Sequence, residues 1–254
     1  MRIKAEGLAA VVGAVLLCFA IPAFGQAVNG QAASMSLTNV NGDPIVTVGG
    51  EEVYAGVYGG TSSLPGANAG IICDDFYDEV GVPDSWAATA YKASTLTAAT
   101  GAKLTATTTP ISDVLFGGNS TGYTNIGIAG YAAIAYLANL SFESSGNPTL
   151  QGNISEAIWS ISDPAIAGTI DSAAQTLVTQ AEAYAQKTND SMSQYTNLWI
   201  YTPSPMIGSG EPQEMWGTVP EGGAAFMYLL LAGIACFGAM RFSPRRQSGR
   251  RQAF

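Results

Sequence analysis

The stretch Ile71-Ile72-Cys73-Asp74-Asp75-Phe76 carries most of the information about the fold. Its apolar residues are typical of a short buried strand, and carboxylates follow that strand at once. Together with Asp78, the residues Asp74 and Asp75 supply hard oxygen ligands at a density that could hold Ca²⁺. The spacing does not fit an EF-hand loop, so a solvated acidic turn is the simpler interpretation.

Strand signals precede this stretch. Residues 33–40 alternate loosely, residues 45–48 form a β-branched run, and residues 53–58 alternate again, with Asn-Gly and Gly-Gly turns between them. We therefore expect a hairpin or meander ahead of the buried strand. Residues 91–109 are rich in Thr and Ala, which predicts a strand or an extended loop.

The spacing of apolar residues becomes helical from about residue 125 to about residue 144. A second helix is predicted to start at a capping box, with Asn153 as N-cap and Glu156 at N3, and to end at Asp163-Pro164. A third helix is predicted over 169–186, a final strand over 198–201, and a flexible linker over 203–218. The sequence thus predicts one α+β domain, residues 26–202, built as a small antiparallel sheet or sandwich with a helical insertion.

The charged residues exclude several classes of function. The chain of 254 residues has a formal net charge of −9 and no histidine. Between residues 26 and 220 there are three lysines, no arginine and 17 acidic residues, a net charge of −14. A phosphate-binding surface needs Lys and Arg, so we expect no nucleic-acid partner. The missing histidine excludes His-based zinc sites and Ser-His or Cys-His catalysis.

Residues 1–25 have the parts of a secretory signal peptide. Arg2 and Lys4 precede an apolar stretch, 8–21, and Ala23-Phe24-Gly25 offers small residues for a cleavage site. We expect an N-terminal signal helix that is cut before Gln26. Cleavage two residues later, after Ala27, and an uncleaved anchor are the alternatives.

The C-terminal end is the most specific feature of the chain. Val219-Pro220-Glu221-Gly222-Gly223 precedes an uncharged apolar run, 224–240. These 17 residues would span roughly 25 Å as a helix, near the lower limit for a bilayer core, so we predict one C-terminal transmembrane helix over 224–242. Five arginines follow the run and are expected to stay cytoplasmic: Arg241, Arg245, Arg246, Arg250 and Arg251.

This three-part tail, residues 219–254, resembles the PEP-CTERM sorting signal of Gram-negative bacteria. It is similar to the VPEGG variant, because Gly222 stands where the commonest form has a second proline. The resemblance implies recognition by an exosortase, a membrane protease-transpeptidase that would act at or near Pro220-Glu221. The protein would then cross the inner membrane once, as a transient intermediate, before release or transfer to another anchor. An ordinary C-terminal membrane anchor is the alternative.

Motifs in the predicted ectodomain resemble those of a group of PEP-CTERM ectodomains that look related to the thioester domains of bacterial surface adhesins. The motifs are Val57-Tyr58, residues 72–76, Trp86, the predicted helix at 131–137 and Ala157-Ile158-Trp159. In thioester domains a cysteine at the Cys73 position bonds to a glutamine two residues before the Ala-Ile-Trp triplet. This chain has Ser155 there, and Gln151 comes one helical turn too early. Cys73 is therefore either a reactive thiol or, as we favour, a small buried hydrophobe.

These observations predict an exported, non-enzymatic protein of the cell envelope or extracellular matrix, with exopolysaccharide as a partner and no cofactor apart from the Ca²⁺ considered above. A thioester-type surface adhesin and a secreted carbohydrate-binding or carbohydrate-active protein are the alternatives. For the latter, Trp86 is the expected surface residue for stacking on sugars. Trp159 lies on an apolar helix face and is expected in the core.

Overall fold

The computed structural model describes residues 27–40, 42–76, 80–97, 102, 126–204, 212–220 and 233–234. The chain divides into two compact units, residues 1–220 and 221–254, and all of the elements named below belong to the first. The predicted signal peptide and the predicted transmembrane helix lie outside the described residues. Within the described ranges, no helix combines the length and the apolar character needed to cross a membrane.

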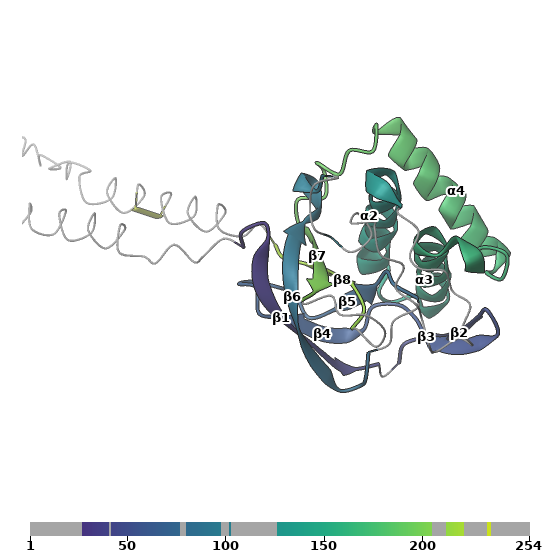
Figure 1. The fold of residues 1–254 in the computed structure, drawn as a ribbon, viewed down its shortest axis with the longest axis horizontal. Helices are drawn as coiled ribbons and strands as arrows, with labels where there is room; N and C mark the ends of the chain where they lie inside the picture. Colours follow the sequence, from purple (N-terminus) through teal and green to yellow (C-terminus); the bar gives the residue numbers. More distant parts are fainter. Residues whose placement is uncertain are drawn as a thin grey trace, which may run out of the picture. The chain divides into compact units, whose positions relative to one another are not determined.

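Along the first unit, a run of strands is followed by a run of helices and then by two more strands (Figure 1). In order they are β1 (Gln31–Asn39), β2 (Ile45–Val48), β3 (Glu51–Tyr54), β4 (Gly59–Ser62), β5 (Ile71–Cys73), β6 (Asp84–Lys92), the 3-10 turn η1 (Ala93–Thr95), α2 (Gly127–Glu143), α3 (Pro148–Ser162), the 3-10 turn η2 (Pro164–Ile166), α4 (Ser172–Lys187), β7 (Leu198–Pro203) and β8 (Met215–Thr218).

Six of these strands form one sheet in the order β4-β1-β6-β7-β8-β5, and every pairing in it is antiparallel. β2 and β3 form a separate hairpin, as their turn chemistry predicted. The helices α2, α3 and α4 lie in the sequence between β6 and β7, which are neighbours in the sheet. Figure 1 shows these helices gathered on one side of the sheet. The prediction of an α+β domain with an antiparallel sheet and a helical insertion is therefore confirmed.

The sheet curls until its two edges meet. Tyr58, just before β4, forms an antiparallel bridge with Ile71 of β5. The N–H of Gly70 donates to the carbonyl oxygen of Gly60 at 2.8 Å. Because its edges are tied together in this way, the sheet has an enclosed concave face and a convex face.

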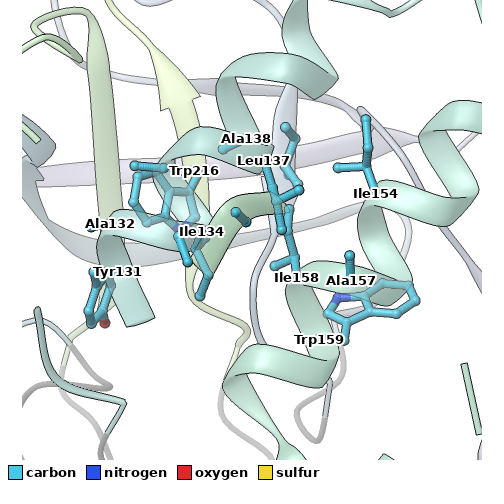
Figure 2. Close-up of a cluster of buried hydrophobic side chains, with 14 of the residues drawn as sticks. Tyr131, Ala132, Ile134, Leu137, Ala138, Ile154, Ala157, Ile158, Trp159 and Trp216 are labelled. Carbon is cyan, nitrogen blue, oxygen red and sulfur yellow. The ribbon is translucent and has the colours of Figure 1, made fainter. Parts of the chain in front are cut away.

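Each face of the sheet has its own core, because side chains alternate along a strand. On β7, Leu198 and Ile200 join the core beneath the helices, whereas Trp199 and Tyr201 join the core on the other face. β5, β7 and β8 are buried on both faces, while β1 and β6 alternate between buried and exposed positions. Figure 2 shows part of the core beneath the helices, with Trp216 from β8 and apolar residues from α2 and α3.

Helix α3 begins earlier than the capping box predicted. Its N-cap is Asn147, whose side chain accepts the N–H of Leu150 at 3.1 Å, and Pro148 occupies the first turn. Asn153 and Glu156 therefore lie inside the helix, and that part of the prediction is wrong. The reason is that Pro148, interpreted as a stop signal for the preceding helix, is also well suited to start the next one because its φ is already helical.

The predicted strand over residues 53–58 is broken at Gly56, which has a φ of +100°. Its N–H donates to Ser155 Oγ at 2.8 Å, so the chain turns here against α3. Glycine adopts a positive φ without the steric cost that other residues incur. The stretch 53–58 is therefore divided into the end of the β2–β3 hairpin and the segment that leads to β4.

The predicted end of the domain at residue 202 is wrong, and so is the linker prediction for residues 215–218. These four residues are β8, which is fully buried and pairs with β7 on one side and β5 on the other. A strand of four residues containing a glycine is too short to show a periodic pattern. Its Pro-, Gly- and Ser-rich surroundings gave it the composition of a linker, and only its place between two strands reveals its role.

Trp86, the surface candidate under the carbohydrate alternative, is instead a buried strand residue. It lies in β6, pairs with Met35 of β1 and is 9% exposed within the core on the concave side of the sheet. Trp159 is buried, as predicted. The stretch predicted as a strand or loop from residue 91 is the end of β6 followed by η1, and most of residues 98–109 lie outside the described ranges.

Candidate functional site

The carboxylates that follow β5 are buried rather than solvated. Asp74 and Asp75 are both 0% exposed. Asp74 Oδ2 accepts the indole N–H of Trp216 at 2.7 Å, and the Asp74 N–H donates to the carbonyl oxygen of Glu214 at 3.3 Å. For Asp74 and Asp75, the prediction of an acidic turn in solvent is therefore wrong, because β8 lies against β5 and Trp216 of β8 donates a hydrogen bond to Asp74.

Glu214 is a third buried carboxylate in this region, and the sequence analysis did not identify it. It is 0% exposed and lies directly before β8. Its Oε1 accepts the phenol O–H of Tyr131 from α2 at 2.5 Å, and its Oε2 accepts the hydroxyl of Thr202 from β7. The Glu214 side chain thus connects α2 and β7 to the residue that precedes β8. Its only sequence signal was that it is one of two acidic residues in an apparent linker.

Of the predicted Ca²⁺ ligands, the structure describes Asp74 and Asp75, whereas Asp78 lies outside the described ranges. Among the described residues, no three Cys, Asp or Glu side chains are grouped closely enough to hold a metal ion. Asp74 and Glu214 accept hydrogen bonds from Trp, Tyr and Thr side chains. Such bonds lower the cost of burying a carboxylate and join the elements that supply them. Ca²⁺ binding stays a prediction.

Cys73 is buried, as favoured from the sequence, with 1% of its surface exposed. Its thiol donates to the carbonyl oxygen of Asp75 at 2.7 Å, and the N–H of Asp75 donates to Sγ at 3.2 Å. Burial raises the pKa of the Cys73 thiol well above its usual value, and the nearby carboxylates of Asp75 and Asp74 raise it further. The neutral thiol is therefore the favoured form, whereas a reactive cysteine needs the thiolate.

Gln151 and Ser155, the two residues compared above with the thioester glutamine, form hydrogen bonds with other groups. Gln151 Oε1 accepts the Ser141 hydroxyl at 2.6 Å, and its Nε2 donates to the Ser141 carbonyl oxygen at 2.5 Å. Ser155 accepts the N–H of Gly56. These hydrogen bonds hold α3 against α2 and against the chain ahead of β4. They give both residues a structural role.

The predicted sorting motif begins where the sheet ends. Val219 is 7% exposed, and its N–H donates to the carbonyl oxygen of Asn197 at 2.8 Å, while Pro220 is exposed. Residues Glu221, Gly222 and Gly223 and the five arginines lie outside the described ranges. The first two residues of the motif are therefore the last two of the first unit.

Comparisons with protein-family models, with curated proteins and with solved structures gave no significant match. The resemblances to PEP-CTERM proteins and to thioester domains therefore remain predictions from the motifs themselves.

Proposed function

We propose that this chain is an exported, non-enzymatic protein of the cell envelope or extracellular matrix, whose folded domain is separated from a C-terminal membrane segment directly after β8. The sequence features that support the proposal are the signal-like start, the motif at residues 219–223, the apolar run and the arginines. The enzyme that makes the cut would be an exosortase, as the resemblance implies.

The structural observation that carries the proposal is the position of the boundary between the two units. It falls between Pro220 and Glu221, inside the predicted sorting motif. A cut there leaves all six strands of the main sheet in the released part. A cut before Met215 would remove β8, and with it the Trp216 bond to Asp74. A cut within the proposed motif would therefore keep every strand of this sheet in one piece, which supports the proposal.

The composition of the domain supports a matrix location. Its described cations are Lys92 and Lys187, and the predicted ectodomain carries a strong negative charge. Net charge far from zero favours solubility and opposes self-association. A protein that works at high local concentration outside the cell benefits from both properties.

The test is the mass of the mature protein from a Gram-negative host, with and without an exosortase. We expect an N-terminus at Gln26 or Val28 and a C-terminus within residues 219–223 only when the exosortase is present. Replacing Pro220 and Glu221 by alanine is expected to prevent the C-terminal cut, and Ser248→Ala serves as a matched control in the basic end. A mature chain that keeps residues 224–254 in the presence of the enzyme overturns the proposal.

A further inference from the structure

The segment that joins β1 to β2 contains the dipeptide Asp43-Pro44, one of two Asp-Pro pairs in the sequence. The nitrogen of such a peptide bond is a tertiary amide, because proline has no backbone N–H. It is therefore more basic than an ordinary amide nitrogen and leaves more readily once it is protonated. An aspartate carboxyl can reach its own carbonyl carbon in a five-membered ring, and carboxyl groups act as nucleophiles in covalent catalysis. An Asp-Pro bond is thus open to attack by the side chain that precedes it.

The carboxyl of Asp43 lies in a setting that keeps its proton. The residue is half-buried, and its Oδ2 is buried with no hydrogen-bond partner among the described residues. Burial raises the pKa of Asp43 from 3.8 to about 6. The titratable group near it is the Tyr58 phenol, which stays neutral because burial raises its pKa well above the usual value. In mildly acidic solution Asp43 therefore carries a neutral carboxyl, which supplies both a nucleophile and a proton.

The backbone is fixed on both sides of this peptide bond. The N–H of Asp43 donates to the carbonyl oxygen of Val40 at 3.3 Å, and the carbonyl oxygen of Pro44 accepts the N–H of Ala55 at 2.9 Å. The proline ring lies against α3, because a Cβ on Gly152 would be 3.8 Å from Pro44 Cβ. These contacts limit the positions of the carboxyl relative to its own carbonyl group, which favours an intramolecular reaction. Pro44 also lines a surface hollow, so water reaches the bond.

The second dipeptide, Asp163-Pro164, offers a comparison within the same chain. Asp163 also has a buried Oδ2 without a partner among the described residues. Its Oδ1, however, accepts the N–H of Ala165 at 3.0 Å, as the N-cap of η2. This hydrogen bond holds the Asp163 carboxyl to the residue after the proline. The two dipeptides have the same covalent structure, so any difference in their chemistry comes from the fold.

We propose that Asp43-Pro44 is a self-cleavage site, at which a carboxyl oxygen of Asp43 attacks its own backbone carbonyl carbon and the chain breaks before Pro44. One C–O bond forms as the C–N bond breaks, and the carboxyl proton moves to the proline nitrogen. The products are a cyclic anhydride on Asp43 and a free amino group on Pro44. Water then opens the anhydride to two carboxyl groups. The inference concerns a modification of the domain and does not rest on the proposed function.

The cleaved chain stays together, because the break lies after a strand held on both sides. β1 pairs with β4 along one edge and with β6 along the other. Its side chains Met35 and Leu37 are buried in the core on that face of the sheet. The N-terminal piece therefore remains in the folded domain through these contacts. The two pieces separate only when the domain is unfolded, so cleavage is seen under denaturing conditions.

Incubation of the full-length chain in a nonionic detergent at about pH 5 tests the proposal, with intact mass measured after denaturation. At this pH a carboxyl with a pKa of about 6 is about nine-tenths neutral, and one with a pKa of 3.8 is about one-twentieth neutral. We expect a new N-terminus at Pro44, formed about tenfold faster than in the same chain unfolded in urea, and a rate that falls as the pH rises through 6. No new terminus at Pro44, or equal rates in the folded and unfolded chains, overturns the proposal, as does equally fast cleavage before Pro164.

Three variants identify the reacting groups. Asp43→Asn lacks the acidic carboxyl and is expected to abolish cleavage, while Pro44→Ala keeps that carboxyl but has a poorer leaving group and is expected to slow it severalfold. Asp163→Asn is the matched control in the other dipeptide, with the rate at Pro44 expected unchanged. Cleavage that persists in Asp43→Asn overturns the proposal. Faster cleavage of Pro44→Ala is the behaviour of a contaminating protease and overturns it as well.

Discussion

Replacing Trp216 by phenylalanine tests whether β8 is held in place by the buried carboxylate next to it. The indole is 0% exposed, donates its N–H to Asp74 Oδ2 at 2.7 Å and contacts the ring of Tyr131, with centroids 6.0 Å apart. Phenylalanine keeps an aromatic ring in the core but cannot donate. The substitution therefore removes one specific hydrogen bond and a little volume.

Two effects add up in this variant. Taking a partner from a buried polar group costs about 1–3 kcal/mol, and more when the group is charged. The smaller ring leaves a space of roughly 40 Å³, which at about 24 cal/mol per Å³ costs about 1 kcal/mol. We expect the free energy of unfolding to fall by about 2–4 kcal/mol, a large share of the 5–15 kcal/mol that is usual for a domain.

The chain offers a matched control in Trp86→Phe. Trp86 is also buried, but its indole N–H has no acceptor among the described residues. The same substitution there removes volume without removing a hydrogen bond, so we expect a loss of about 1 kcal/mol or less. Urea unfolding of the full-length chain in a nonionic detergent, followed by near-ultraviolet circular dichroism, measures both. Equal losses in the two variants would refute the role given to the Trp216–Asp74 hydrogen bond.

Three further predictions concern the extent of the domain and two unusual side chains. A chain ending at residue 202 lacks β8 and is expected to show no cooperative unfolding, whereas a chain spanning 27–220 is expected to unfold in one transition; calorimetry of both decides. Burial raises the Asp43 pKa from 3.8 to about 6, so its contribution to stability is full below pH 4 and lost as pH rises through 6. Asp43→Asn is therefore expected to gain about 1 kcal/mol at neutral pH, after allowance for solvent screening, and nothing below pH 4, with thermal unfolding across that range as the check. In the 27–220 chain Cys73 is the only cysteine, and we expect a maleimide to label it only after unfolding and the intact mass to show no loss of ammonia. Rapid labelling of the native chain contradicts its buried place.

The elements that could be predicted are those whose pattern repeats within a single segment. Helix α2 places Tyr131 and Ile134 on one buried side, as the spacing of its apolar residues predicted. The hairpin of β2 and β3 follows from its Gly49-Gly50 turn, where both glycines have positive φ. In each case the residues that decide the structure are neighbours in the chain, so their order alone carries the information.

The buried site could not be predicted because its partners come from distant segments. Asp74 and Trp216 are 142 positions apart, and Tyr131 and Glu214 are 83 apart. Whether an acid next to a strand is solvated depends on what packs over it. Here β8 does so, and it lies in a stretch with the composition of a linker.

By itself, the order of residues determined the class of the domain, its helical insertion and the uneven placement of charge, since each of these depends on local spacing or on simple counting. Only the tertiary structure decided that β8 joins β5 to the rest of the sheet and that three carboxylates are buried beside it. The physical reason is that burial is a property of pairs of segments: a carboxylate or a tryptophan acquires its role from the strand or helix that covers it.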